Sequence, residues 1–269
     1  MKITFTKCHA NGNDFILILE KNFPKNISKK IIINKLCDRN KGVGADGLLI
    51  ISDSDKYDFL LNYYNSDGSW ETLCANGSRC ACLYMYTNNK VENNIVFMTG
   101  DGVHYANINK DNTISMSMIT PKYSSKLISP EGYEGYFIDS GAPHYVTELE
   151  NLTTKDDLIN DAKNIRFNEA FSERGTNVNF YNKKSESILN ILTYEKGIEN
   201  FVLSCSSGST AVVFHAAKKF NLKSPTTTIS PGGKLKFIYD DLWKDAWCVG
   251  PAEILFTAKF CYIKNKVSF

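Results

Sequence analysis

Short runs of alternating polar and apolar residues recur along the whole chain, and Gly, Pro, Asn and Asp separate them. A period of two is typical of strands that bury one face. The pattern predicts strands over residues 3–5, 15–19, 48–52, 58–64, 95–99, 115–119, 135–139, 145–148, 178–181, 187–194, 235–239 and 253–259. Helical spacing is rarer and predicts outer helices over 27–39 and 152–164, with two more that begin near Cys74 and Cys205. We therefore expect an α+β protein with antiparallel character.

Two segments share one plan, which suggests that the chain consists of two related halves. CANGSRCACLYMY (74–86) and CSSGSTAVVFHAA (205–217) each begin with Cys, continue with two small or polar residues and Gly, and then become apolar. Each follows a predicted strand and a turn, and the copies lie about 130 residues apart, which is about the size of one domain. The pattern predicts two strand-wrapped central helices with a cysteine at each N-terminus.

A cysteine at a helix N-terminus has specific chemistry. The unpaired amides there carry roughly half a positive charge, so they favour a thiolate and can hold a substrate carboxylate. If Cys74 and Cys205 faced one carbon, one thiolate could remove an α-proton while the other thiol donated a proton from the opposite face. Inversion of an amino-acid α-carbon without a cofactor requires this arrangement, and the helix-end amides would stabilise the developing negative charge.

Two other interpretations of these cysteines stay open at this point. Both thiols are also typical of buried structural groups that cap small-residue helices. Cys74, Cys80 and Cys82 lie close together in the sequence, but their gaps fit common zinc spacings poorly and no His lies nearby. A metal site is therefore not expected.

Composition and charge narrow the classes of partner and the compartment. The chain has 269 residues, and 31 basic against 29 acidic side chains give a net charge of +2, which argues against a nucleic-acid partner. No uncharged apolar run approaches the roughly 20 residues that span a bilayer, and the N-terminus lacks the apolar region of a signal peptide. We therefore expect a cytoplasmic protein with no membrane contact, in which the eight cysteines form no extensive disulfide framework.

Nine stretches follow one another along nearly the whole chain. They are KCHANGNDF (7–15), DRNKGVGADGLL (38–49), YNSDGSWETLCANGSRC (64–80), TGDG (99–102), SGAPHYV (140–146), SERGTNVNF (172–180), TYEKGIENFVLSCSSGSTA (193–211), SPGGKLKF (230–237) and VGPAEILF (249–256). Together they resemble the diaminopimelate epimerase-like family of cofactor-independent racemases. The resemblance implies two pseudo-symmetric domains, each a β-barrel-like antiparallel or mixed sheet wrapped around a central helix, with the active site in the cleft between them. The expected halves are 1–120 and 121–256, with a final strand at about 257–269 that returns to the first half.

The resemblance implies a role for each matching residue. Cys74 and Cys205 match the acid–base pair, which agrees with the argument from the helix N-termini. His144 and Glu195 match the neighbours that tune which thiol holds the proton. The remaining matches would bind substrate through helix-end amides or polar side chains: Asn13, Asn65, Ala75, Asn76, Asn177, Lys196, Ser206, Ser207 and Gly208. The family needs no cofactor or metal, acts on a small amino acid, and often forms a homodimer.

The sequence departs from the family pattern in the substrate pocket. Ala142 stands where the family has Asn before Pro-His, and Lys196 stands where it has Arg. In diaminopimelate epimerases those two residues help to hold the distal carboxylate, and lysine is only a point charge where arginine binds with two hydrogen bonds. CANG and CSSG also replace the family's CGNG and CGTG, which reduces the space beside the substrate. We therefore favour an amino acid other than diaminopimelate. Histidine comes first, because the wider family includes histidine racemases and Glu195 could pair with an imidazolium.

Three alternatives remain. Diaminopimelate, or its sulfur analogue lanthionine, stays the substrate if Lys196 and a water replace the lost contacts. A paralogue that binds an amino acid without turning it over is the non-enzymatic alternative, although binding alone needs neither thiol. A phenazine-type isomerase of the same fold is disfavoured, because those enzymes work through a carboxylate and both thiol positions here are Cys.

Overall fold

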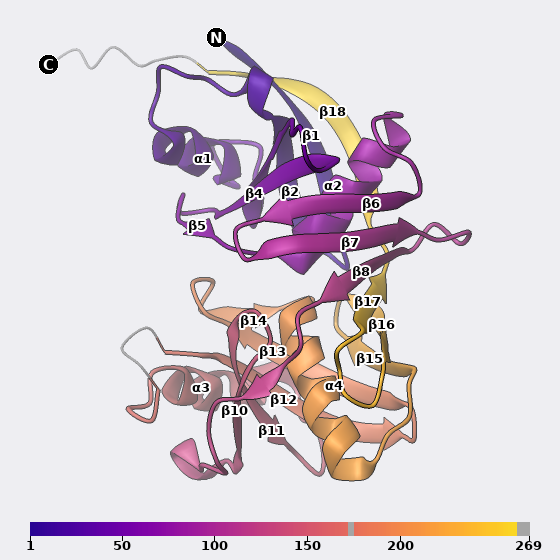
Figure 1. The fold of residues 1–269 in the computed structure, drawn as a ribbon. Coiled ribbons are helices and arrows are strands. Elements are labelled where there is room, and N and C mark those ends of the chain that lie inside the picture. Colours follow the sequence, from indigo (N-terminus) through magenta and orange to yellow (C-terminus); the bar gives the residue numbers. More distant parts are fainter. Residues whose placement is uncertain (172–174, 263–269) are drawn as a thin grey trace, which may run out of the picture. The chain divides into compact units, whose positions relative to one another are not determined.

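The computed structural model describes residues 1–171 and 175–262 (Figure 1). Its first elements are β1 (Lys2–Ala10), β2 (Asn13–Leu19), η1 (Glu20–Asn22), α1 (Lys29–Cys37), β3 (Gly47–Ser52), β4 (Phe59–Asn65), β5 (Trp70–Glu71), α2 (Ala75–Thr87), β6 (Asn94–Thr99) and β7 (Gly102–Ile108). They are followed by β8 (Ile114–Met118), β9 (Lys122–Tyr123), η2 (Pro130–Gly132), β10 (Gly135–Asp139), β11 (Pro143–Glu148), α3 (Lys155–Arg166), β12 (Asn177–Ser185), β13 (Ile188–Glu195) and β14 (Asn200–Val202). The last elements are α4 (Ser206–Phe220), β15 (Thr226–Ser230), β16 (Gly233–Tyr239), β17 (Ala246–Gly250) and β18 (Glu253–Cys261).

The predicted strands and helices all have counterparts in the structure, and the α+β class is confirmed. Six strands were not predicted: β5, β7, β9, β14, β15 and β17. β5 and β9 contain two residues each, too few to show a period. β15 and β17 are antiparallel neighbours of β16, and each also pairs with a strand that is distant in sequence, β13 and β8 respectively. Such pairing leaves little signal in a local pattern.

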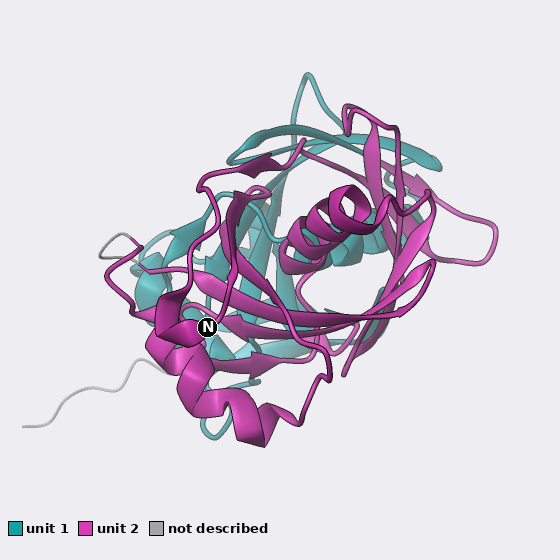
Figure 2. Cartoon of the chain, turned by 90° about the horizontal axis from the view of Figure 1, so that it is seen from below, with its two compact units in different colours: residues 1–10, 14–105, 252–269 teal, residues 11–13, 106–251 magenta. Residues whose placement is uncertain are grey.

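The chain divides into two compact units (Figure 2). Unit 1 contains Met1–Ala10, Asp14–Tyr105 and the described residues from Ala252, whereas unit 2 contains Asn11–Asn13 and Ala106–Pro251. This boundary lies earlier than the expected residue 120, because β8 pairs with β17 inside unit 2. The return to unit 1 likewise begins before residue 257, since β18 pairs with β1 from its first residue. Residues 263–269 of the expected final strand lie outside the described residues.

Unit 1 is a mixed sheet with two helical crossovers. β1 is antiparallel to β18 and also pairs with β2. β2 and β3 are parallel neighbours, β3 and β4 are antiparallel, and β4 and β6 are again parallel. Parallel neighbours need a crossover connection, and here α1 joins β2 to β3 while α2 lies between β4 and β6.

Unit 2 repeats the same succession of strands and helices. β10 and β11 are antiparallel, β11 and β12 are parallel across α3, and β12 and β13 are antiparallel. β13 and β15 are then parallel across α4. The internal repeat that the two cysteine segments suggested is therefore a repeat of the whole β-α-β-β-α-β order, and the sheet in each unit is mixed.

α2 and α4 are the central helices of their units. α4 contacts β11, β12, β13, β15 and β16, and Figure 2 shows it enclosed by strands of unit 2. α2 contacts β1, β3, β4 and β18. Small side chains make this close enclosure possible: a Cβ on Gly77 would lie 2.7 Å from the Cδ2 atom of Leu49. The run of small residues in both segments thus serves packing as well as chemistry.

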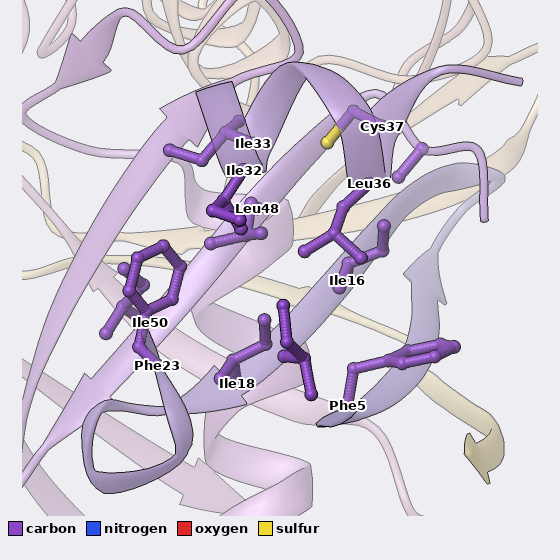
Figure 3. Close-up of a cluster of buried hydrophobic side chains, with 12 residues drawn as sticks. Phe5, Ile16, Ile18, Phe23, Ile32, Ile33, Leu36, Cys37, Leu48 and Ile50 are labelled. Carbon is purple, nitrogen blue, oxygen red and sulfur yellow. The ribbon is translucent and has the colours of Figure 1, made fainter. Parts of the chain in front are cut away.

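Each unit has an apolar core of its own. In unit 1, α1 buries Ile32, Ile33, Leu36 and Cys37 at helical spacing against the side chains of β1, β2 and β3 (Figure 3). Complete burial of one such aliphatic side chain stabilises a fold by about 1.5–3 kcal/mol. In unit 2, α3 contributes Leu158, Ala162 and Ile165 to a second cluster, which also contains Tyr145, Phe171, Val178, Phe180 and Tyr194.

Candidate active site

Cys74 is the N-cap residue of α2 in unit 1. Its backbone is extended (φ −135°, ψ 103°), and its sulfur accepts a hydrogen bond from the Gly77 amide at 3.5 Å. The side chain is partly exposed, so the sulfur serves as a cap and is also accessible. The predicted position at a helix N-terminus is therefore confirmed.

The next residues of α2 are buried. Ala75 and Asn76 are 6% and 3% exposed. The Asn76 side chain is directed at Arg79, whose guanidinium donates to its Oδ1 atom at 2.7 Å. Arg79 is completely buried, and the sequence interpretation did not single it out. The sequence did offer a signal for this residue, because an Arg is unusual within a predicted helix of mostly small and apolar residues.

Asn65 and Asn13 lie at strand ends. Asn65 ends β4, where its Oδ1 accepts from the Tyr63 hydroxyl at 2.8 Å and its Nδ2 donates to Ser69 Oγ at 3.0 Å. Asn13 begins β2 and is partly buried. Asn65 also begins a turn, since its carbonyl accepts from the Gly68 amide at 2.9 Å, and turn formation is the usual role of Asn.

Cys205 is the N-cap residue of α4 in unit 2, with almost the same geometry as Cys74. Its backbone angles are φ −135° and ψ 112°, and its sulfur accepts from the Gly208 amide at 3.4 Å. Ser206 and Gly208 are buried, whereas Cys205 and Ser207 are partly exposed. The two cysteine segments are thus equivalent in structure as well as in sequence.

A row of hydrogen bonds runs inward from Cys205. Its sulfur lies 3.4 Å from Ser207 Oγ, which lies 2.9 Å from His144 Nε2. His144 Nδ1 lies 3.1 Å from the Nδ2 atom of Asn179, and the Oδ1 atom of Asn179 accepts from Thr193 at 3.0 Å. We call these five residues the Cys205 row. It joins the start of α4 to β11, β12 and β13.

The inner part of the Cys205 row is buried. His144 and Asn179 are completely buried, and Thr193 is 4% exposed. Burial lowers the pKa of His144 to about 3. His144 is therefore a neutral imidazole at physiological pH.

Glu195 and Lys196 lie where β13 ends. Glu195 is the last residue of β13 and pairs with Asn200 of β14. The backbone amide of Lys196 donates to Asn177 Oδ1 at 2.9 Å, and Asn177 Nδ2 donates to the carbonyl of Pro143 at 2.8 Å. Asn177 thus connects the start of β11 and the start of β12 to the residue that follows β13, and this fixes the backbone amide of Lys196.

The structure joins several predicted residues within unit 2 and adds three that were not predicted. Cys205, Ser207, Gly208 and His144 form one group, and Asn177 joins Lys196. The additional residues are Asn179, Thr193 and Ser140, whose hydroxyl donates to the carbonyl of Ser207 at 2.8 Å. Asn179 follows Asn177 by two positions on a strand and so shares its face, a signal that the sequence offered. Ser172, Glu173 and Arg174 of the SERGTNVNF motif lie outside the described residues.

Neither a metal-binding group of side chains nor a membrane-spanning helix is found among the described residues. Over residues 1–171 and 175–262, no three His, Cys, Asp or Glu side chains are grouped so that they could hold a metal ion. Cys80 and Cys82 are buried in α2, and burial raises the pKa of both thiols. No helix within these same residues combines the length and apolar character that a membrane span needs.

Comparisons with known proteins find relatives that match nearly the whole chain. A family model described as diaminopimelate epimerase matches residues 5–123. A diaminopimelate epimerase of Flavobacterium psychrophilum is 35% identical over 257 residues, which cover 93% of this chain and 97% of the relative. One of Aquifex aeolicus is 33% identical over 270 residues, which cover 95% and 96%. A solved hydroxyproline epimerase from Agrobacterium vitis, with bound trans-4-hydroxy-L-proline, has the same fold, with a TM-score of 0.75, 10% identity and coverage of 96% of this chain and 92% of that one.

Proposed function

Since this chain belongs to the diaminopimelate epimerase family, we propose that it is a cofactor-independent isomerase that inverts the α-carbon of an amino acid with Cys74 and Cys205 as its acid–base pair. The observation that carries the proposal is the equivalence of the two cysteines. Each caps the N-terminus of a central helix, and each sulfur accepts from the amide of the Gly three residues further on. A structural role alone would need neither the partial exposure of the two thiols nor their repetition in both units.

The proposed reaction consists of two proton transfers. One cysteine, as thiolate, removes the α-proton, and the other, as thiol, protonates the α-carbon from the opposite face. The mechanism requires both sulfurs to act on the same carbon. The substrate carboxylate is held by amides at the helix N-termini, contributed by Ala75 and Asn76 in one unit and by Ser206, Ser207 and Gly208 in the other. These amides also stabilise the negative charge that the carboxylate gains as the carbanion forms.

The polar neighbours have subsidiary roles in this proposal. His144 and Glu195 determine which thiol holds the proton in each half of the reaction, and Asn13, Asn65, Asn177 and Lys196 bind the remainder of the substrate. His144 reaches Cys205 through Ser207, so it acts on the thiol without contact.

Diaminopimelate is the substrate favoured by the relatives. Proteins named diaminopimelate epimerase are 35% and 33% identical to this chain over nearly its whole length. Under this proposal the protein converts the LL form to the meso form, and Lys196 holds the distal carboxylate in place of the family's arginine. Lanthionine has the same two head groups and would fit the same pocket.

Histidine is the substrate favoured by the pocket residues. Ala142 lacks the amide of the family's Asn, and loss of such a donor from a buried site costs about 1–3 kcal/mol if its partner stays unsatisfied. Together with Lys196, this change would weaken the selection for a second amino-acid head group by about 10-fold or more. The imidazole ring of histidine, neutral or singly charged, does not require these contacts to a second amino-acid head group.

Exchange of the α-proton in D2O, followed by NMR with dithiothreitol present, decides between these substrates. L-histidine and LL-diaminopimelate are compared side by side, and a panel of other L-amino acids follows. Exchange of one substrate alone assigns the pocket to it. If no amino acid of the panel exchanged its α-proton, with reduced thiols confirmed, the proposal of an amino-acid isomerase would be refuted. A paralogue that only binds amino acids would then be favoured.

Two variants test the mechanism apart from the substrate. Cys74→Ser and Cys205→Ser should each lower turnover by about 100-fold or more, because general acid–base catalysis by one group contributes at least that much. Substrate binding, measured by calorimetry, should persist in both. Unchanged turnover in either variant would refute the two-thiol mechanism.

The family's homodimer stays a prediction, which light scattering on the purified protein tests.

A further inference from the structure

The direction of every hydrogen bond in the Cys205 row follows from one backbone carbonyl. The Nδ2 atom of Asn179 lies 3.0 Å from the carbonyl oxygen of Tyr145, which can only accept. Its Oδ1 atom accepts from Thr193 on the other side. The amide orientation of Asn179 is therefore determined, and Nδ2 is the atom that also faces His144.

The orientation of Asn179 in turn determines the tautomer of His144. Since Nδ2 can only donate, His144 Nδ1 must accept and so carries no proton. The imidazole is buried and neutral, so its single proton is on Nε2. His144 Nε2–H therefore donates to Ser207 Oγ at 2.9 Å.

The Ser207 hydroxyl is left with one proton of its own to donate. One of its lone pairs is occupied by His144, and Cys205 Sγ lies 3.4 Å from its oxygen. Ser140 fixes the backbone at this point by donating to the Ser207 carbonyl. We propose that Ser207 is a positioning residue whose hydroxyl donates to the sulfur of Cys205 and thereby keeps Cys205 as the resting thiolate of the pair. This inference rests on the proposed function for its consequence in catalysis.

The surroundings of Cys205 within unit 2 agree with a thiolate. The sulfur also accepts from the Gly208 amide, at the positive end of the α4 dipole. The first turn of α4, residues 206–209, contains only Ser and Gly. The strands beside it bring the neutral His144 of β11 and the amides of β12, and the charged side chains at this end of β13 are Glu195 and Lys196.

Gly208 gives the row the space it needs. A Cβ at this position would lie 2.4 Å from Asn179 Oδ1 and 3.2 Å from the Cε1 atom of His144. The start of α4 can approach the buried pair only because residue 208 has no side chain. The glycine therefore allows Ser207 to reach His144 and Cys205 together.

The test measures the reactivity of Cys205 and does not need turnover. Wild-type protein, Ser207→Ala and Ser207→Thr are labelled with iodoacetamide over a range of pH. Trypsin releases residues 197–218, in which Cys205 is the sole cysteine, and the exposed Cys261 serves as the internal reference. Circular dichroism of each variant confirms the fold.

We expect the labelling midpoint of Cys205 to rise by about one pH unit or more in Ser207→Ala, because a hydrogen bond to a charged group is lost. Ser207→Thr keeps the hydroxyl and should restore the midpoint. Equal midpoints in wild type and Ser207→Ala would overturn the proposal.

A second measurement tests the tautomer without any variant at Ser207. Nitrogen-15 NMR of the four histidines, assigned by single substitution of the other three, should show His144 protonated on Nε2 alone. A proton on Nδ1, or on both nitrogens, at neutral pH would overturn the proposal. If no α-proton exchange occurred in D2O while the labelling and NMR results were both as expected, the proposed function would be refuted. The proposed role of Ser207 in the Cys205 row would still stand.

Discussion

Acidification from pH 7 to 5 should weaken the fold through two buried histidines. Burial lowers the pKa of His144 to about 3 and that of His215, in α4, to about 4. An unfolded histidine titrates near pH 6.5. Below that pH the two histidines bind protons in the unfolded chain and stay neutral in the folded chain. Stability is therefore fully present above about pH 6.5 and is lost as the pH falls toward the folded pKa values.

The size of the loss follows from the two pKa values at each site. At pH 5 an unfolded histidine is mostly protonated, whereas both buried imidazoles are still neutral. The difference in proton binding costs about 2 kcal/mol at each site relative to pH 7, and so about 4 kcal/mol for the two. That is a large fraction of the 5–15 kcal/mol that is typical of a folded domain.

Urea unfolding at pH 7 and pH 5 measures this loss. His144→Gln and His215→Gln should each lose about 2 kcal/mol less than wild type between the two pH values, and the double variant about 4 kcal/mol less. The comparison is within each variant, so a general destabilisation by the substitution cancels. If His144→Gln lost as much stability as wild type, the folded His144 imidazole would bind a proton as readily as the unfolded one, and the lowered pKa would be refuted.

Three further predictions concern other parts of the molecule. Burial raises the pKa of Asp14, but hydrogen bonds from Arg39 and Lys7 outweigh it and lower the pKa to about 2. Asp14→Asn should therefore lower the unfolding free energy at pH 7 by about 2 kcal/mol and remove part of the decrease in stability between pH 4 and 2. The control Glu150→Gln, at an exposed site, should change neither quantity. Gly208→Ala should lower the melting temperature, because its new Cβ overpacks the buried side chains behind it at a cost of about 1–3 kcal/mol, and an unchanged melting temperature would contradict the close approach. Oxidation of the two proposed catalytic thiols should abolish turnover and dithiothreitol should restore it; full activity after a mass-verified link between them would contradict the two-thiol mechanism.

The helix-capping cysteines could be predicted from the sequence because capping is local chemistry. A side chain at the N-cap, small residues after it and Gly at the fourth position lie within one turn, and Cys74 and Cys205 have the expected place. The central helices and the internal repeat followed from the same short pattern. The resemblance to a family added the polar neighbours.

The inner half of the Cys205 row could not be predicted, because it depends on which strands become neighbours. Asn179 meets His144 since β12 lies parallel to β11 in a register that pairs His144 with Asn177. Thr193 joins them because β13 pairs antiparallel with β12 and places it opposite Asn179. The register between β11 and β12, whose paired residues lie more than thirty positions apart in the sequence, is set by tertiary packing. The unit boundary could not be predicted for the same reason, because β8 pairs with β17, a strand that ends at Gly250.

The pairing of β1 with β18 has a consequence for the order of synthesis. Unit 2 is continuous from Ala106 to Pro251, so apart from the short segment Asn11–Asn13 the ribosome completes it in one piece. β1 must wait for Glu253–Cys261, which the ribosome adds last among the described strands. At about 5–20 residues per second this delay lasts many seconds, during which one edge of the N-terminal strand stays unpaired. The last strand of unit 1 is therefore synthesised only after unit 2 is complete, and nascent chains stalled before Glu253 should leave the edge of β1 that pairs with β18 open to proteolysis or to a chaperone.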